Sequence, residues 1–182
     1  MKETELKIRL YADPALRKNS EKVTHITQVH REILSRMSRL MYQAGGIGLA
    51  APQVGINESL IVVDIGSGLY KLVNPKITRK EGRQGMEEGC LSIPGVCIKV
   101  RRARKVFVKA EDENANPVFI EAEGLLACVL QHEIEHLHGK LIIDHASFLE
   151  RLKIKRKLVQ LKKKAEDERL SESKTQYCQL QL

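Results

Sequence analysis

The residues with the clearest chemical potential lie in the segment 131–136, which reads Gln-His-Glu-Ile-Glu-His and contains an H-E-x-x-H pattern. Residues four positions apart on a helix share a face, with Cβ atoms roughly 5–6 Å apart, so His132 and His136 could bind one divalent metal ion. Glu133 is turned away by one position, which would place its carboxylate beside a water molecule on that ion. For an isolated match, the alternative is two histidines on a solvated helix face. Flanking apolar residues favour metal binding, because buried histidines need polar partners.

A third metal ligand is expected outside this pattern. Gly139 matches the metzincin extension H-E-x-x-H-x-x-G-x-x-H, but Ile142 occupies its last position, which excludes that class. Glu150 or Glu166 could serve in a gluzincin, although both belong to a basic segment. Cys90 is the better candidate, because a thiolate suits zinc or ferrous iron and the preceding glycine allows the backbone to approach closely. Taken alone, a single cysteine is more often a small buried hydrophobic residue.

A third motif, residues 45–55, is rich in glycine and alanine. No strand pattern precedes it, and it has neither G-x-G-x-x-G nor Gly-Lys-Ser/Thr, so phosphate binding is not expected. Such a segment lets the backbone approach a substrate edge on, and the side-chain amide of Gln53 could donate a hydrogen bond to an oxyanion. The alternative is a tight connection between a helix and a strand.

Together, these motifs resemble those of the peptide deformylases, which remove the N-formyl group from nascent polypeptides that begin with formylmethionine. The family's signatures G-x-G-x-A-A-P-Q, E-G-C-L-S and Q-H-E-x-x-H correspond here to residues 46–53, 88–92 and 131–136, in the family's order. The resemblance covers about residues 5 to 160. It implies a metal-dependent hydrolase in which Cys90, His132 and His136 hold the ion and Glu133 is the general base and acid. Formate and a free N-terminus would be the products.

The same resemblance implies the remaining site residues and the ion. Gln53 and the backbone N–H of Leu91 would form the oxyanion hole. Substrate would bind along Ile47, Gly48 and Gly89, and its methionine side chain would enter an apolar pocket lined in part by Cys128 and Val129. Fe²⁺ is implied as the native ion, with Zn²⁺, which binds more tightly by the usual affinity order, as the alternative occupant.

Two positions depart from the family pattern. Many members have Asp where this chain has Glu135, and an arginine is common near Cys97. The first change preserves the charge. The second puts the positioning of substrate in doubt.

The elements that must position these motifs follow from hydrophobic periodicity. Apolar residues recur at steps of three and four over 24–43 and again over 125–137, which predicts two amphipathic helices. Five short β-prone segments separated by Gly, Pro and Asn lie between them, at 60–65, 70–73, 96–100, 106–109 and 118–120. A last helix is expected over 148–164. We therefore predict an α+β fold with antiparallel or mixed sheets wrapped around a central helix that carries H-E-x-x-H, with N- and C-terminal helices.

The chain of 182 residues has the length of one domain. We predict a single catalytic domain over 1–164 and a polar, flexible tail over 165–182. The net charge of +8 is concentrated in residues 150–164, which hold eight basic residues and one acidic residue. This segment is either a solvated helix face or a contact with the ribosome or its RNA, because clustered cations neutralise phosphates.

Location and redox state follow from what the sequence lacks. No segment reaches the ~18 apolar residues of a membrane helix, and the first residues show no secretory signal, so we expect no membrane contact and an intracellular protein. A bacterial cytoplasm and an organelle after removal of an import segment both remain open. The four cysteines form no C-x-x-C and are expected as thiols or metal ligands.

Two rival functions use only part of the pattern. A zinc endopeptidase would need H-E-x-x-H alone. A non-enzymatic RNA-binding module would need the basic segment alone, without aromatic side chains to stack on bases.

Overall fold

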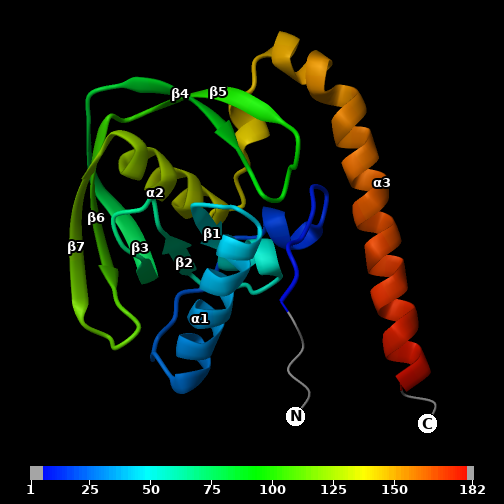
Figure 1. The fold of residues 1–182 in the computed structure, drawn as a ribbon, viewed down its shortest axis with the longest axis horizontal. Coiled ribbons are helices and arrows are strands. Elements are labelled where there is room, and N and C mark those ends of the chain that lie inside the picture. The colour runs from blue at the N-terminus through cyan, green and yellow to red at the C-terminus, as the bar shows by residue number, and fades with distance from the viewer. Residues whose placement is uncertain (1–5, 180–182) are drawn as a thin grey trace.

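The structure is a computed structural model that describes residues 6–179, with side chains described through residue 167. Two antiparallel sheets enclose a central helix, α2 (Gly124–His136), as Figure 1 shows. The larger sheet has the strand order β1 (Gly48–Ala50), β2 (Leu60–Val63), β3 (Tyr70–Glu81), β6 (Lys105–Glu111) and β7 (Pro117–Glu123). The smaller sheet is the hairpin of β4 (Gln84–Gly89) and β5 (Cys97–Arg102). The predicted α+β fold with sheets around a central helix is confirmed.

The other helices frame this core. Helix α1 (Gln28–Gln43) begins after Thr27, whose backbone N–H donates to the His30 ring at 2.9 Å, and therefore starts a turn later than predicted. Short 3-10 helices lie at Pro14–Arg17 (η1), Ala51–Val54 (η2) and Ile142–His145 (η3). No helix in the described part of the chain is long and apolar enough to cross a membrane.

Helix α3 (Phe148–Gln179) extends beyond the predicted end at Lys164. Residues 165–179 contain neither Gly nor Pro, and Lys162 and Glu166 lie 4.0 Å apart in an i, i+4 pair that supports the helix across the expected boundary. A polar composition alone therefore did not end the helix. The flexibility expected for this segment stays a prediction, and residues 180–182 lie outside the described part.

The five predicted strands all occur, but two further strands were missed. β1 pairs with β2 through Gly48↔Val63, and β4 pairs with β5 through Glu88↔Ile98. β1 contains Gly and Ala and β4 is rich in Gly and Glu, all residues of low β propensity, so pairing with a neighbour decides the conformation of both segments. Both missed strands carry site residues.

The core is aliphatic, as the composition requires. The buried hydrophobic residues of the described chain include no aromatic side chain. Leu130 and Ala127 of α2 are fully buried against the larger sheet, where they meet Ile61 and Val63 of β2 and β1's Ala50. This packing fixes the face of α2 that turns away from the sheet, which is the face that carries the histidines.

Candidate active site

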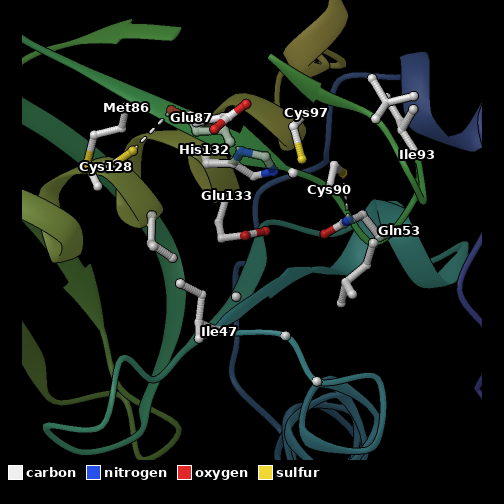
Figure 2. Close-up of a pocket in the computed structure, with 18 of the residues that line it drawn as sticks. Ile47, Gln53, Met86, Glu87, Cys90, Ile93, Cys97, Cys128, His132 and Glu133 are labelled. Carbon is white, nitrogen blue, oxygen red and sulfur yellow. Dashed lines mark hydrogen bonds and ion pairs between the residues drawn. The ribbon is translucent and has the colours of Figure 1, made fainter. Parts of the chain in front are cut away.

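The predicted site residues come from distant parts of the chain, and all of them except His136 line one cavity of about 460 Å³ (Figure 2). The five residues predicted to bind substrate, Ile47, Gly48, Gly89, Cys128 and Val129, all line it. So do the predicted catalytic residues Gln53, Leu91 and Glu133 and the predicted ligands Cys90 and His132. The sequence patterns therefore selected side chains that the fold brings together.

The wall residues that were not predicted include Met86 on β4, Leu125 in the first turn of α2 and Cys97 on β5. Leu125 lies four positions before Val129 and shares its helix face, so helical spacing could have identified it. Met86 belongs to a strand that propensity did not reveal. Cys97 lies opposite Gly89 in the β4–β5 register, so a thiol lies at the cavity wall near the place where an arginine is common in the family.

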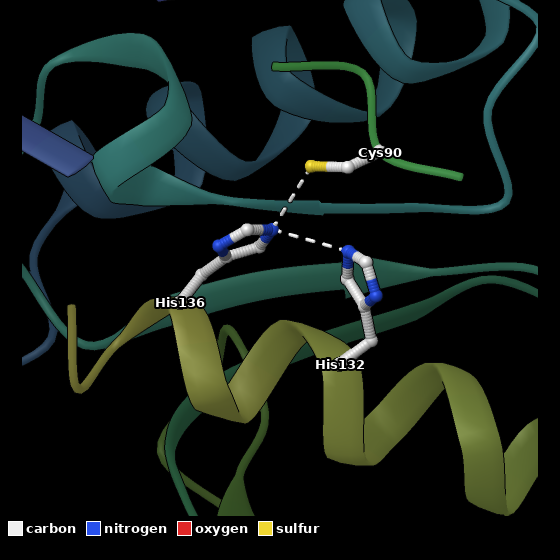
Figure 3. A group of neighbouring side chains, drawn as sticks. All are labelled: Cys90, His132 and His136. Atoms are coloured by element: carbon white, nitrogen blue, oxygen red, sulfur yellow. Dashed lines mark hydrogen bonds between the residues drawn. The ribbon is translucent and has the colours of Figure 1, made fainter. Parts of the chain in front are cut away.

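The side chains of Cys90, His132 and His136, the candidate metal ligands, point toward one another (Figure 3). The Sγ atom of Cys90 lies 3.3 Å from Nε2 of His136, which lies 3.1 Å from Nε2 of His132. All three ligand atoms lie within 4.8 Å of one another. Neighbouring ligands of a tetrahedral ion with bonds of 2.0–2.3 Å are about 3.3–3.8 Å apart, so one thiolate and two imidazoles fit a single divalent transition metal.

Each histidine is oriented by an acceptor at its other ring nitrogen. Nδ1 of His132 lies 2.9 Å from the Glu88 carboxylate, and Nδ1 of His136 lies 3.1 Å from the Lys140 carbonyl oxygen. Because both partners accept hydrogen bonds, each Nδ1 carries a proton, and each Nε2 is the ring atom that faces the candidate metal position. Hydrogen bonds thus select the tautomer that the site needs.

Burial and neighbouring groups shift the two histidines in opposite directions. Burial opposes protonation of His132, but hydrogen bonds with Cys90 and Glu88 raise its pKa to about 10. Burial and the charge of His132 lower the pKa of His136. Binding of a metal ion to Cys90, His132 and His136 would therefore displace a proton from these side chains, as is general for thiolate and imidazole ligands.

A buried ion pair supports this arrangement and was not predicted from the sequence. Arg102 donates from Nη2 to Glu88 at 2.8 Å, and both side chains are less than a tenth exposed. Burial opposes ionisation of Glu88, but hydrogen bonds from His132 and Arg102 lower its pKa to about 2. Arg102 also lies 3.1 Å from Glu135, which pairs with His145 at 2.9 Å. Glu135 is therefore an acidic residue, like the aspartate that many family members have here, and its carboxylate contacts both Arg102 and His145.

Glu133 points into the cavity without a partner of its own. Its Oε2 atom is buried and has no hydrogen-bond partner among the described residues. Burial, opposed by the charges of His132 and Arg102, raises its pKa to about 7. A Cβ atom at Gly48 would collide with the Glu133 carboxylate, so this approach requires glycine. An unsatisfied buried carboxylate oxygen beside three converging ligands marks where a water molecule or substrate would sit.

The amide of Gln53 is held at both ends. Its Oε1 accepts from the Ala50 N–H at 2.8 Å, while Nε2 lies 3.2 Å from Ser92 Oγ and 3.5 Å from Cys90 Sγ. The fixed carbonyl oxygen leaves the NH₂ group facing the candidate metal group. Ser92, which is fully buried, was not predicted, although it belongs to the E-G-C-L-S segment.

The thiol of Cys128 is a neutral part of the wall. It donates to Glu88 at 3.0 Å, and burial together with the Glu88 carboxylate raises its pKa to about 12. A protonated thiol beside Val129 and Leu125 is compatible with an apolar pocket.

Comparisons with known proteins decide the family. A model of the polypeptide deformylase family matches residues 5–152 of this chain. The chain belongs to the peptide deformylase family. The peptide deformylase of Halothermothrix orenii is 51% identical over 141 residues, which cover 76% of this chain and 92% of the relative.

Solved structures of peptide deformylases have the same fold as this chain. A peptide deformylase from Synechococcus elongatus in complex with actinonin matches with a TM-score of 0.81 and 41% identity over 86% of this chain and 90% of that chain. A peptide deformylase from Legionella pneumophila matches with a TM-score of 0.83 and 42% identity, covering 88% and 96%. The protein is therefore a metal-dependent hydrolase that removes the N-formyl group from nascent peptides. The predicted family and reaction are confirmed, and the endopeptidase and non-enzymatic alternatives are set aside.

Replacing Gly48 by Ala should displace the Glu133 carboxylate. Because a misplacement of about 1 Å can reduce a rate 10²-fold, we expect hydrolysis of a formyl-Met peptide to fall by about 10² while metal content stays near one ion per chain. Gly85→Ala is the matched control, since a Cβ there meets only the flexible end of Lys99. Equal activity of the two variants, measured as formate release, would contradict the requirement for glycine.

Replacing Arg102 by Met should leave the Glu88 charge buried and poorly compensated. We expect the free energy of unfolding to fall by about 3–5 kcal/mol and the metal affinity to fall by about 10- to 100-fold, because Glu88 no longer holds His132. Urea titration and competition with a chromophoric chelator measure the two effects. Adding Glu88→Gln should restore part of the stability but not the affinity. An unchanged affinity of Arg102→Met would show that the pair does not orient the ligand.

Proposed function

We propose that Cys90, His132 and His136 hold one divalent metal ion and that Glu133 is the general base and acid of deformylation. The observation that carries the proposal is the convergence of three ligand atoms beside the partnerless Oε2 of Glu133. When bound, the ion would lower the pKa of a coordinated water toward ~7 and polarise the formyl carbonyl group as a Lewis acid.

Glu133 moves the proton. Its Oε2 would accept a proton from the attacking water and deliver it to the departing amine. A pKa of about 7 suits both halves of this task, because a group that titrates near the working pH can take up and release a proton. Because Gly48 has no side chain, the carboxylate has room to lie at the cavity wall.

Gln53 and Leu91 would stabilise the oxyanion. The Gln53 NH₂ group is preorganised by the Ala50 and Ser92 contacts, and the backbone N–H of Leu91 follows the Cys90 ligand directly. Fixed donors near the developing negative charge need little reorganisation during the reaction, which is why such sites are effective.

The substrate would lie along the edge of the cavity formed by the backbone of Ile47, Gly48 and Gly89. Its methionine side chain would occupy the apolar part of the wall near Cys128 and Val129. Because a formyl carbon carries only hydrogen, a site crowded by Glu133 against Gly48 can exclude acetylated and internal peptide bonds by shape.

We propose Fe²⁺ as the native ion, with Zn²⁺ as the alternative occupant. The mixed thiolate and imidazole set accepts either ion, and geometry alone does not separate them. We further propose that the basic helix, residues 150–164, contacts the ribosome or its RNA, and that the enzyme works in a bacterial cytoplasm or, after import, in an organelle. The exposed cations of α3 support this contact.

Glu133→Ala should retain about one metal ion per chain and lose formyl-peptide hydrolysis by at least ~10²-fold, because the proton acceptor is gone. Formate release under saturating substrate gives the rate, and elemental analysis gives the metal content. Cys90→Ala is the comparison, since it should lose the metal as well. Normal turnover by Glu133→Ala would refute its role.

Metal identity is tested on protein purified without oxygen. We expect iron at about one ion per chain, loss of formate release on chelation, and faster turnover after reloading with Fe²⁺ than with Zn²⁺. Exposure to air should inactivate the iron form more quickly than the zinc form, because Cys90 can be oxidised. Equal rates and equal air stability of the two forms would count against iron as the native ion.

A further inference from the structure

A second cavity, of about 820 Å³, lies against the β4–β5 hairpin and is separate in its lining from the active-site cavity. Lys99 and Arg101 of β5 line it together with Arg83, which directly precedes β4, and His145 of η3 and Glu150 in the first turn of α3 line its other side. No step of deformylation uses these residues.

The charges around this cavity are unbalanced. The side chains of Arg83, Lys99 and Arg101 are exposed and have no ion pair or hydrogen bond with any residue whose side chain is described. The anionic group, Glu150, is already engaged, because it accepts from the N–H and the hydroxyl of Ser147 at 2.8 and 2.6 Å. His145 is held by Glu135. Uncompensated cations that share a hollow repel one another and attract an anion.

Helix α3 extends this basic surface along the hairpin. Glu150 lies at the Lys99 end, and two turns later the Nζ of Lys157 lies 3.4 Å from where a Cβ of Gly95 would be. The helix therefore runs beside β5 toward the hairpin turn. The exposed cations Lys153 and Arg156 lie between these two contacts along the helix. Arg83, Lys99, Arg101, Lys153 and Arg156 are thus five exposed cations on neighbouring parts of the hairpin and α3.

We propose that the exposed face of the β4–β5 hairpin is an RNA-binding surface that takes the phosphodiester backbone and continues the contact of α3. This inference rests on the proposed function only in its helix part. Arg83, Lys99 and Arg101 are all exposed, and none of the three is buried to hold a single small anion. Several spaced cations instead suit a polyanion, where each neutralised phosphate releases counterions. Recognition would be independent of RNA sequence, since the surface offers charge and not a set of base-reading side chains.

The hairpin also connects this surface to the reaction. On the same exposed face, Lys99 lies opposite Glu87 and Cys97 lies opposite Gly89, and both Glu87 and Gly89 line the active-site cavity. RNA bound at Lys99 and Arg101 would thus lie next to the wall of the substrate site. The N-terminus of a polypeptide that emerges beside the RNA would then be close to the cavity.

The test compares two double variants of the full-length protein. Lys99→Gln with Arg101→Gln removes two hairpin cations, and Lys22→Gln with Arg39→Gln removes two exposed cations from elsewhere, Arg39 being on α1. The probe is a fluorescent 20-nucleotide single-stranded RNA of mixed sequence, followed by anisotropy between 50 and 200 mM KCl. The hairpin pair should flatten the slope of log K against log salt by about 1.4, since each lost phosphate contact contributes about 0.7. The control pair should leave the slope near that of the native protein.

Hydrolysis of a short formyl-Met peptide separates this inference from the proposed function. The hairpin pair should hydrolyse it as the native protein does, and an inactive native protein would count against the proposed catalytic roles without touching the RNA result. A third double variant, Lys153→Gln with Arg156→Gln, reports on the helix. Loss of RNA binding in the helix pair alone would overturn the hairpin surface, and so would equal losses in the hairpin and control pairs. Weaker binding of the hairpin pair to phosphatidylglycerol vesicles, with RNA binding unchanged, would also overturn it.

Discussion

The carboxylate of Glu88 links the parts of the molecule on which the site depends. It accepts from His132 of α2, from Arg102 of β5 and from the thiol of Cys128, and so ties the hairpin to the central helix. Without these hydrogen bonds, little would fix the position of the hairpin, which leads to Cys90, relative to the helix that carries both histidines. A buried charge destabilises the fold unless it is paired and hydrogen-bonded. Here Arg102 compensates the charge of Glu88, and Glu88 in turn orients the ring of His132.

The position of Cys90 follows from the same constraint. Cys90 follows the last residue of β4, and the β4–β5 register places Gly89 opposite Cys97. The hairpin is fastened to α2 by Glu88, two residues before the ligand. A single buried network therefore sets both the tautomer of His132 and the reach of the thiol. This explains how a short, polar, two-stranded sheet can hold the thiol of Cys90 in a defined position beside the two histidines.

Close packing at the opposite wall is achieved with glycine. β1 passes so near Glu133 that Gly48 has no room for a side chain, and the adjacent 3-10 helix directs Gln53 back toward Cys90. The cavity is thus enclosed by backbone on one side and by α2 on the other. The hairpin has two uses along one exposed face, since its end near Gly89 lines the cavity and its end near Arg101 carries unpaired positive charge.

The sequence by itself determined the family and the class of fold, and it selected Cys90, His132, His136 and Glu133, which the fold brings close together. H-E-x-x-H needs only helical spacing to place two imidazoles together, and apolar periodicity showed which helix lies in the core. Glu88, Arg102 and Ser92 could not be identified in this way, because their roles depend on partners that are distant in sequence. The strands β1 and β4 were not predicted for a related reason, because pairing with β2 and β5 overrides their weak β propensity. Only the tertiary structure decided these points, because hydrogen bonds and charges in a desolvated interior act between neighbours in space, whatever their separation along the chain.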